Sequence, residues 1–296
     1  MKKLLLLEGL LFIMIFGVNA QNDTLPWKKA IQTGINLSQA SFSDNWKGGG
    51  TNSLAFGTFF NGKINYESRE VSFNNDVKLA YGFVQNQGQE SRKMADQIFL
   101  DSKVGWKFGK YWNLFGSLNF QTQFEPGYEY GKDASGKETA ALISKFMAPG
   151  YLTSSIGFEY KPVEYWWIRF GTGTLRQTFV VDTTLYKNSK TVENNYGVEK
   201  NKKVKNEIAL QLIGSFDKDI AKNLNFKFRF MALAPYEHFG SIVSRLDAGI
   251  TARVNKFINV TISGTILNDI NQDAKVQYNQ FFGLGILYSF SQFKEK

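Results

Sequence analysis

The chain has 296 residues, of which 16% are aromatic and none is cysteine, and its formal net charge is +9. The lack of cysteine excludes disulfides, thiol chemistry and a lipid-modified N-terminal cysteine. A mean hydropathy of −0.27 is too polar for a bundle of membrane helices, and no apolar run after residue 20 reaches the roughly 20 residues that a spanning helix needs. A membrane β-barrel fits such a composition, because its polar residues face the lumen.

The N-terminus is typical of a secretory signal peptide. Lys2 and Lys3 precede the apolar segment Leu4–Gly17, and the small residues 18–20 provide a cleavage site before Gln21. An uncleaved membrane anchor is the alternative, which the shortness of the apolar run disfavours. We therefore predict a signal peptide over 1–20, a short periplasmic lead over 21–29, a barrel over 30–291 and a C-terminal tail over 292–296.

Most of the mature chain alternates between apolar and polar residues, which predicts half-buried β-strands. In one stretch Phe73, Val77 and Leu79 share a parity, and Asp76 and Lys78 share the other. The pattern predicts twelve strands, at about 30–42, 51–66, 71–84, 96–108, 112–124, 146–160, 165–181, 206–216, 224–233, 242–254, 258–267 and 277–290.

The connections between these strands alternate in length. Those after the even-numbered strands are short turns, as in the hairpin of residues 104–120, whereas those after the odd-numbered strands are longer and polar. Short turns at one end and long loops at the other are typical of a single antiparallel transmembrane β-barrel in the bacterial outer membrane, with periplasmic turns and extracellular loops. A soluble β-sandwich is the alternative, but it has no reason to sort loop lengths in this way.

Aromatic residues gather near the predicted strand ends, where the girdles of a membrane barrel lie. Local packing at hairpin ends is the alternative explanation. The predicted interface aromatics are Trp46, Tyr111, Trp112, Tyr165, Trp166 and Trp167.

The inward parity of the predicted strands carries charges of both signs. One interpretation is a selectivity lining for a pore; the other is a network of paired charges that fills the lumen, since twelve strands lie between filled eight-stranded barrels and open sixteen-stranded ones. The predicted lumen-lining residues are Lys63, Asp76, Lys78, Asp101, Lys103, Lys107, Glu207, Lys227, Arg229, Arg245, Asp247 and Arg253.

Other chemistry finds little support in the sequence. His238 is the sole histidine, and no nucleophile motif surrounds the nearby Ser241 and Ser244. No cysteine or histidine pair has metal-ligand spacing, and the glycines at 48–50 lack the lysine of a phosphate loop. We therefore expect no enzyme activity, no cofactor and no nucleic-acid partner. The basic loop 183–205 suits contact with lipid phosphates, although a solvated loop is the simpler interpretation.

Several segments resemble a family of exported proteins from Bacteroidetes-group bacteria that is known only as a domain of unknown function. They are 36–40 (NLSQA), 45–53 (NWKGGGTNS), 73–75, 79–82 (LAYG), 122–128 (TQFEPGY), 148–152 (APGYL) and 282–285 (FGLG) with Tyr288 and Phe290. The resemblance extends over the mature chain and implies an outer-membrane barrel. It supplies no activity and no catalytic residues.

Two hypotheses on function follow. The first is a narrow, porin-like channel of a Gram-negative cell for small polar or ionic solutes, gated by the loops 125–145 and 182–205. The second is a non-conducting structural or binding barrel that displays its loops to envelope polymers or partner proteins. The expected surroundings are outer-membrane lipid and lipopolysaccharide, and the sequence leaves the solute and the oligomeric state open.

Overall fold

The computed structural model describes residues 27–43, 51–187, 194–255 and 257–293. The predicted signal peptide, most of the predicted lead and Trp46 lie outside these residues. The predicted barrel start at residue 30 is slightly late, because Trp27–Lys29 already pair with Ile64–Tyr66.

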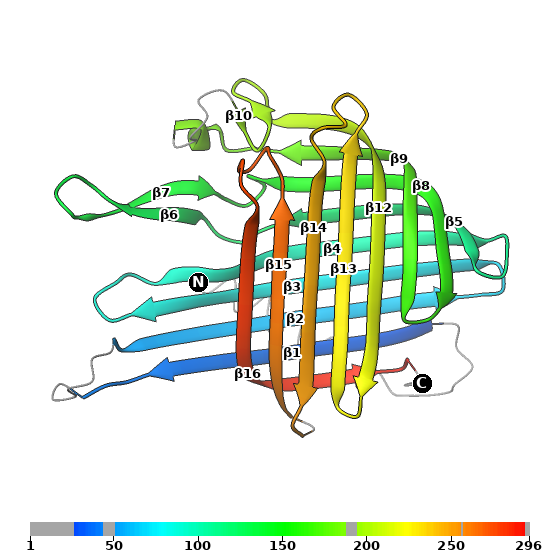
Figure 1. The fold of residues 1–296 in the computed structure, drawn as a ribbon, viewed down its shortest axis with the longest axis horizontal. Coiled ribbons are helices and arrows are strands. Elements are labelled where there is room, and N and C mark those ends of the chain that lie inside the picture. The colour runs from blue at the N-terminus through cyan, green and yellow to red at the C-terminus, as the bar shows by residue number, and fades with distance from the viewer. Residues whose placement is uncertain (1–26, 44–50, 188–193, 256, 294–296) are drawn as a thin grey trace, which may run out of the picture.

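Twelve antiparallel strands form one closed barrel, in the order β1-β16-β15-β14-β13-β12-β9-β8-β5-β4-β3-β2 (Figure 1). Most neighbouring barrel strands follow each other directly in the chain. The exceptions are β5 and β8, which are separated by β6 and β7, β9 and β12, which are separated by η1, β10 and β11, and the first and last strands, β1 and β16. The strands are β1 (Trp27–Ala40), β2 (Ser53–Glu67), β3 (Val71–Asn86), β4 (Arg92–Lys107), β5 (Trp112–Thr122), β8 (Gly150–Val163), β9 (Trp166–Phe179), β12 (Val204–Ala221), β13 (Leu224–Pro235), β14 (Val243–Arg253), β15 (Ile258–Asn268) and β16 (Gln277–Ser291).

The twelve predicted strands are all present, but several begin or end elsewhere. β4 starts at Arg92 rather than 96, and β12 continues to Ala221 rather than stopping at 216. The turn to β13 is therefore only Lys222 and Asn223, and Asn223 takes the left-handed φ of 64° that a short asparagine side chain tolerates. The polar ends of both strands lack apolar residues at alternate positions, so periodicity underestimates them.

The loops contain structure that periodicity did not predict. Within 125–145, β6 (Gly127–Lys132) and β7 (Glu138–Ser144) form a hairpin that extends beyond the barrel wall (Figure 1). Within 182–205 lie a 3₁₀ turn, η1 (Thr183–Lys187), and a short hairpin of β10 (Asn194–Asn195) and β11 (Val198–Glu199). A small apolar cluster of Ala148, Val180, Leu185 and Val198 holds this second loop against the start of β8.

The strand register identifies the inner face of the barrel. Residues opposite each other in antiparallel strands point to the same side of the sheet. Lys63 is opposite Asp76, and Asp76 is opposite Asp101. The Lys63 side chain also reaches Asp217 on β12, which is six strands from β2 in either direction around the barrel. Only a path through the lumen joins such strands, so this face is the inside.

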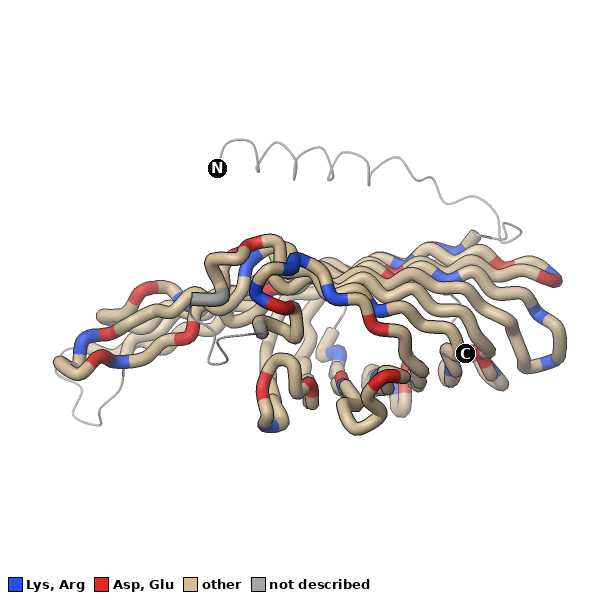
Figure 2. The backbone as a smooth tube through the Cα atoms, turned by 90° about the horizontal axis from the view of Figure 1, so that it is seen from above, with Lys and Arg blue, Asp and Glu red and all other residues tan. Residues whose placement is uncertain are grey.

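The outer face is apolar around the barrel. Large apolar side chains that alternate with the inner residues are exposed on both walls, including Trp106, Leu118, Ile156, Ile208, Ile262 and Ile286. A continuous exposed apolar surface of this kind is unfavourable in water and is the arrangement of a transmembrane β-barrel. Acidic and basic residues are interspersed over the chain rather than gathered at one end (Figure 2).

Within the described residues, no helix is long and apolar enough to cross a membrane.

Candidate functional site in the barrel lumen

Two sets of ion pairs cross the lumen from wall to wall. In the first, Asp217 on β12 lies 3.6 Å from Lys63 Nζ on β2 and 3.3 Å from Lys227 Nζ on β13. In the second, Asp101 on β4 lies 3.4 Å from Arg229 on β13 and 3.7 Å from Arg169 on β9. Lys227 is on the strand next to Asp217, but the Lys63–Asp217 pair and both Asp101 pairs join strands that are not neighbours. These three pairs therefore narrow the lumen as well as neutralise its charges.

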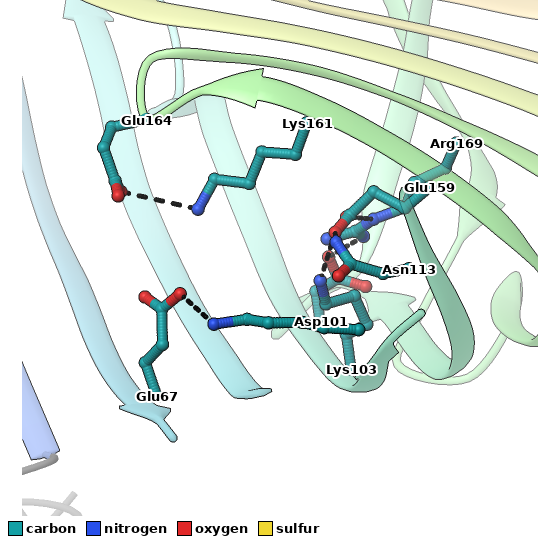
Figure 3. Close-up of polar contacts among 9 residues, drawn as sticks. Glu67, Asp101, Lys103, Asn113, Glu159, Lys161, Glu164 and Arg169 are labelled. Carbon is teal, nitrogen blue, oxygen red and sulfur yellow. Dashed lines mark hydrogen bonds and ion pairs between the residues drawn. The ribbon is translucent and has the colours of Figure 1, made fainter. Parts of the chain in front are cut away.

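A buried network surrounds Glu159 on β8, whose side chain is 1% exposed (Figure 3). Lys103 Nζ donates to its Oε1 at 2.6 Å, and Asn113 Nδ2 donates to the same oxygen at 3.0 Å. Arg169 Nε donates to Oε2 at 2.7 Å. Both carboxylate oxygens therefore face cations, which compensates the cost of burying the charges. The pair Glu67–Lys107 and the pair Lys161–Glu164 lie apart from this network.

Aromatic rings fill part of the lumen beside these charges. Trp167 lies opposite Ser215, which lies opposite Arg229, so all three point inward. The Arg169 guanidinium lies 4.0 Å from the centre of the Trp167 ring, and that of Arg229 lies 5.8 Å from it. The expectation that Trp167 is an interface aromatic is therefore wrong. Successive residues of a strand point to opposite sides, so Trp166 and Trp167 of β9 cannot both face outward.

The two sides of the lumen differ in how far their charged side chains are exposed. The polar residues around Glu159 on the β4–β9 wall are almost fully buried. On the other side, the side chains of Lys63 and Lys227 are 44% and 49% exposed, and that of Asp247 is 39% exposed. Exposure inside a barrel requires space for water. The lumen thus combines a packed polar wall with a charged wall that is accessible to solvent.

A loop covers part of the end that carries the long loops. Asp269, at the start of the β15–β16 connection, is buried and receives a hydrogen bond from Arg176 of β9 at 3.2 Å. The Arg176 guanidinium lies 4.7 Å from the centre of the Tyr151 ring, and Gln272 Nε2 donates to the Tyr151 hydroxyl at 3.0 Å. These contacts run from β15 to β8 and β9, across the mouth of the barrel. We call residues 269–272 the mouth loop.

Hydrogen bonds to Asp182 hold the start of the β9–β12 loop in place outside the barrel. We call these contacts the Asp182 tether. Lys145 Nζ donates to Asp182 Oδ2 at 2.6 Å, while the amide and hydroxyl of Thr184 donate to its Oδ1 at 2.9 and 2.6 Å. These donors hold the pKa of Asp182 well below its usual range. The aspartate therefore stays ionised in the folded protein over the whole neutral and mildly acidic range.

The register places all twelve predicted lumen residues on the inner face. Most meet an opposite charge: Lys107 contacts Glu67, Glu207 contacts Lys205, and Arg245 contacts Asp247. Lys78 instead lies 5.2 Å from the centre of the Phe99 ring. Their contribution to ion selectivity stays a prediction.

Sequence reasoning missed several inward-facing residues that form these contacts. The alternation Ile156, Phe158, Tyr160 against Glu159 was available as a signal for Glu159. Arg176 was harder to place, because the β9–β12 register shifts between Ala209 and Gln211. That bulge brings Arg169 and Arg176 to the same side, although their positions differ in parity.

Four of the remaining predicted interface aromatics form one band at the end with the short turns. Trp112 packs on Tyr160 at 4.9 Å between ring centres, Tyr160 packs on Trp166 at 6.0 Å, and Tyr165 packs on Phe216 at 5.6 Å. Tyr111 joins Tyr160 at 6.2 Å. That this band lies at a membrane interface stays a prediction.

His238 lies exposed in the β13–β14 connection, where its carbonyl accepts the Ser241 amide. Across the parts of the chain that the structure describes, no three acidic, histidine or cysteine side chains are placed to hold a metal ion.

Comparisons with known proteins give an incomplete family match and distant structural similarities. A family model described as a protein of unknown function (DUF3078) matches residues 37–128, which is the first part of the barrel. No curated protein matches the chain.

Among solved structures, an outer-membrane channel from Pseudomonas putida F1 is 8% identical over 92% of this chain and 100% of its own, with a TM-score of 0.40. The translocator domain of the autotransporter NalP from Neisseria meningitidis is 11% identical over 96% and 95%, with a TM-score of 0.39. The toluene transporter TbuX from Ralstonia pickettii is 8% identical over 90% and 88%, with a TM-score of 0.31.

Proposed function

We propose that this protein is a narrow channel of the bacterial outer membrane that passes small ions and small polar solutes. The observation that supports this best is the solvent exposure of the inner charges opposite the packed wall. Asp217 pairs with Lys63 across the lumen and with Lys227 on the neighbouring strand, yet each of the three side chains keeps 35–49% of its surface accessible. Water beside mobile charges of both signs offers a path for hydrated ions and excludes bulky solutes.

In this proposal the ion pairs around Asp217 and Asp101 form the constriction of the channel. A permeating ion must replace one partner of the Lys63–Asp217 or Asp101–Arg229 pair as it passes. Arg169 and Arg229 together face Asp101, and Lys63 and Lys227 together face Asp217. Each acidic group is thus shared by two cations, and an excess of positive charge at the constriction favours anions. The mouth loop controls access to this zone from the end with the long loops.

The second candidate is a non-conducting barrel, which the same cross-lumen contacts favour if they never open. In this version the packed Glu159 network serves stability. The function then belongs to the loops, chiefly the β6–β7 hairpin that extends beyond the wall. A catalytic role for His238 is not part of either proposal, and we expect a His238→Ala variant to behave as the parent protein does.

The deciding experiment is single-channel recording of the refolded mature protein in a planar bilayer under a salt gradient. A heat-modifiable gel shift first establishes that the barrel is folded. Discrete current steps with a reversal potential on the anion side are the expected result. A folded barrel that passes no current would reject the channel and leave the second candidate.

A further inference from the structure

The seam between the first and last barrel strands is paired over only part of its length. β1 and β16 pair from Ala30 with Ser291 to Asn36 with Gly285. Beyond that point, among the described residues, Leu37–Ala40 of β1 pair only with β2, and Gln277–Leu284 of β16 pair only with β15. By contrast, β2 and β3 pair continuously from Ser53 with Asn86 to Glu67 with Ser72. β16 changes direction where its pairing passes from β15 to β1 (Figure 1).

Three apolar side chains lie on the inner surface at or near the end of the paired part of the seam. Phe59 of β2 lies opposite Gly34 and therefore points inward, and its ring lies over Gly34 of β1. Phe281 of β16 also points inward, because it continues the parity of Gly285, and its ring lies over Gly283. Leu287 adds a third apolar side chain, which is buried. The two aromatic rings thus stand on opposite sides of the seam.

The outer surface at the same place faces hydrocarbon if the barrel spans a bilayer. Leu37 on β1 and Phe282 and Leu284 on β16 are all well exposed and point outward. Between the inner and outer apolar side chains run two strand edges whose backbone N–H and C=O groups on the seam side have no strand partner within the described part of the chain. Such groups are costly in lipid and need another hydrogen-bonding partner.

We propose that the unpaired part of the seam is a lateral opening that takes a single-chain amphiphile. Its alkyl chain would lie against Phe59 and Phe281, and its polar head would hydrogen-bond to the free strand edges. The ion pairs Lys63–Asp217 and Asp101–Arg229 block the axial route for such a molecule, which leaves the sideways route into the bilayer. The inference requires that the barrel spans a membrane, as proposed above, but not that it conducts ions.

The first test asks whether the seam is open. The chain has no native cysteine, so any disulfide must come from the introduced residues. If the seam continued its register, Leu37 would lie opposite Leu284, because Asn36 lies opposite Gly285. In lipid nanodiscs, the pair Leu37→Cys and Leu284→Cys should resist oxidation to a disulfide, while the control pair Thr33→Cys and Tyr288→Cys, which are opposite each other, should form one. Equal oxidation of the two pairs overturns the proposal. A disulfide between two molecules of the Leu37→Cys, Leu284→Cys variant also overturns it, in favour of a second copy on the edge.

The second test locates the ligand with a photoreactive twelve-carbon fatty acid in the same nanodiscs. We expect labelling near Phe59 on the inner face, in addition to labelling of outward residues that demonstrates membrane insertion. Phe281→Gln should reduce the inner labelling severalfold, and the adjacent outward variant Phe282→Gln should not. Labelling confined to outward residues, or an equal response of both variants, rejects the amphiphile. Because the readout is the position of the label, a silent bilayer recording does not affect it.

Discussion

Asp101 on β4 and Arg229 on β13 come from opposing walls of the barrel, and their side chains meet at 3.4 Å in the lumen. No neighbouring-strand contact produces this pair, because five strand steps separate β4 from β13 along the shorter way around. The lumen is therefore organised by contacts through its interior. The variants below change contacts in the lumen, at the mouth of the barrel and in the loop outside it.

Reversal of charge at the constriction should change ion selectivity. In Lys63→Glu, the new carboxylate faces Asp217, and in Arg229→Glu it faces Asp101. Two charges about 4 Å apart interact by about 4 kcal/mol at an effective dielectric constant of about 20. We expect the permeability ratio to move severalfold toward cations, measured as the reversal potential in a salt gradient. Lys132→Glu, on the β6–β7 hairpin, is the control. Unchanged selectivity in both lumen variants would contradict a charge-lined path.

Loss of the Glu159 charge should destabilise the barrel strongly. Glu159→Gln leaves Lys103 buried without its counter-ion and Arg169 with Asp101 alone, and the loss of one partner of a buried pair costs about 3–5 kcal/mol. Urea unfolding in lipid vesicles measures the change. The control Glu138→Gln breaks an exposed pair with Arg92 and should cost less than about 1 kcal/mol. The double variant Glu159→Gln with Lys103→Met should regain part of the loss. If the two single variants are equally stable, the network is not a stabilising element.

Release of the mouth loop should open the channel more often. Asp269→Asn removes the charge that Arg176 holds across the mouth. We expect a severalfold longer time in open current levels. Asp273→Asn, in the same connection but exposed, should leave the gating unchanged. An identical gating record for both variants would show that the mouth loop does not restrict entry.

The hydrogen bonds of Asp182 with Lys145 and Thr184 should weaken only in acid. The pKa of Asp182 is lowered in the folded protein, first by the hydrogen bond from Lys145 and then by those from Thr184. The stabilisation is therefore present above the unfolded pKa of about 3.9 and is lost as the pH falls through the lower folded value. The amide chemical shift of Thr184, followed by NMR from pH 6 downward, should start to change only below that unfolded value. In Lys145→Met the titration should move upward, whereas Lys137→Met should not move it. A titration that Lys145→Met leaves in place would contradict the assigned cause.

The sequence predicted the barrel well because one physical period governs almost all of it. Membrane on one side and lumen on the other impose strict alternation, so Asp76, Asp101 and Arg229 were placed on the correct face by parity alone. Trp167 was misplaced because parity is ambiguous within three consecutive aromatics. Arg176 was missed because a bulge changes the parity within β9.

The contacts that make the candidate site are a different matter. Asp101 meets Arg229, and Asp217 meets Lys63, only because the tilt and stagger of the strands bring distant positions to one level of the lumen. Alternation carries no information on stagger. The mouth loop was equally hidden, since Asp269 reads as an ordinary loop residue until Arg176 is seen across the opening.

The partly paired seam also bears on how the molecule comes apart. β1 and β16 are the two ends of the barrel sequence, so closing them encloses nearly the whole chain in one loop, at an entropic cost that grows with the logarithm of its length. Only the backbone hydrogen bonds between β1 and β16, from Ala30 with Ser291 to Asn36 with Gly285, offset this entropic cost. This paired segment is short, so it contributes few such bonds. Fraying should therefore start here, and the earliest amide protons to exchange within the barrel strands should belong to β1 and β16. For the same reason, we expect β1 and β16 to pair last during folding, after the other hairpins have formed.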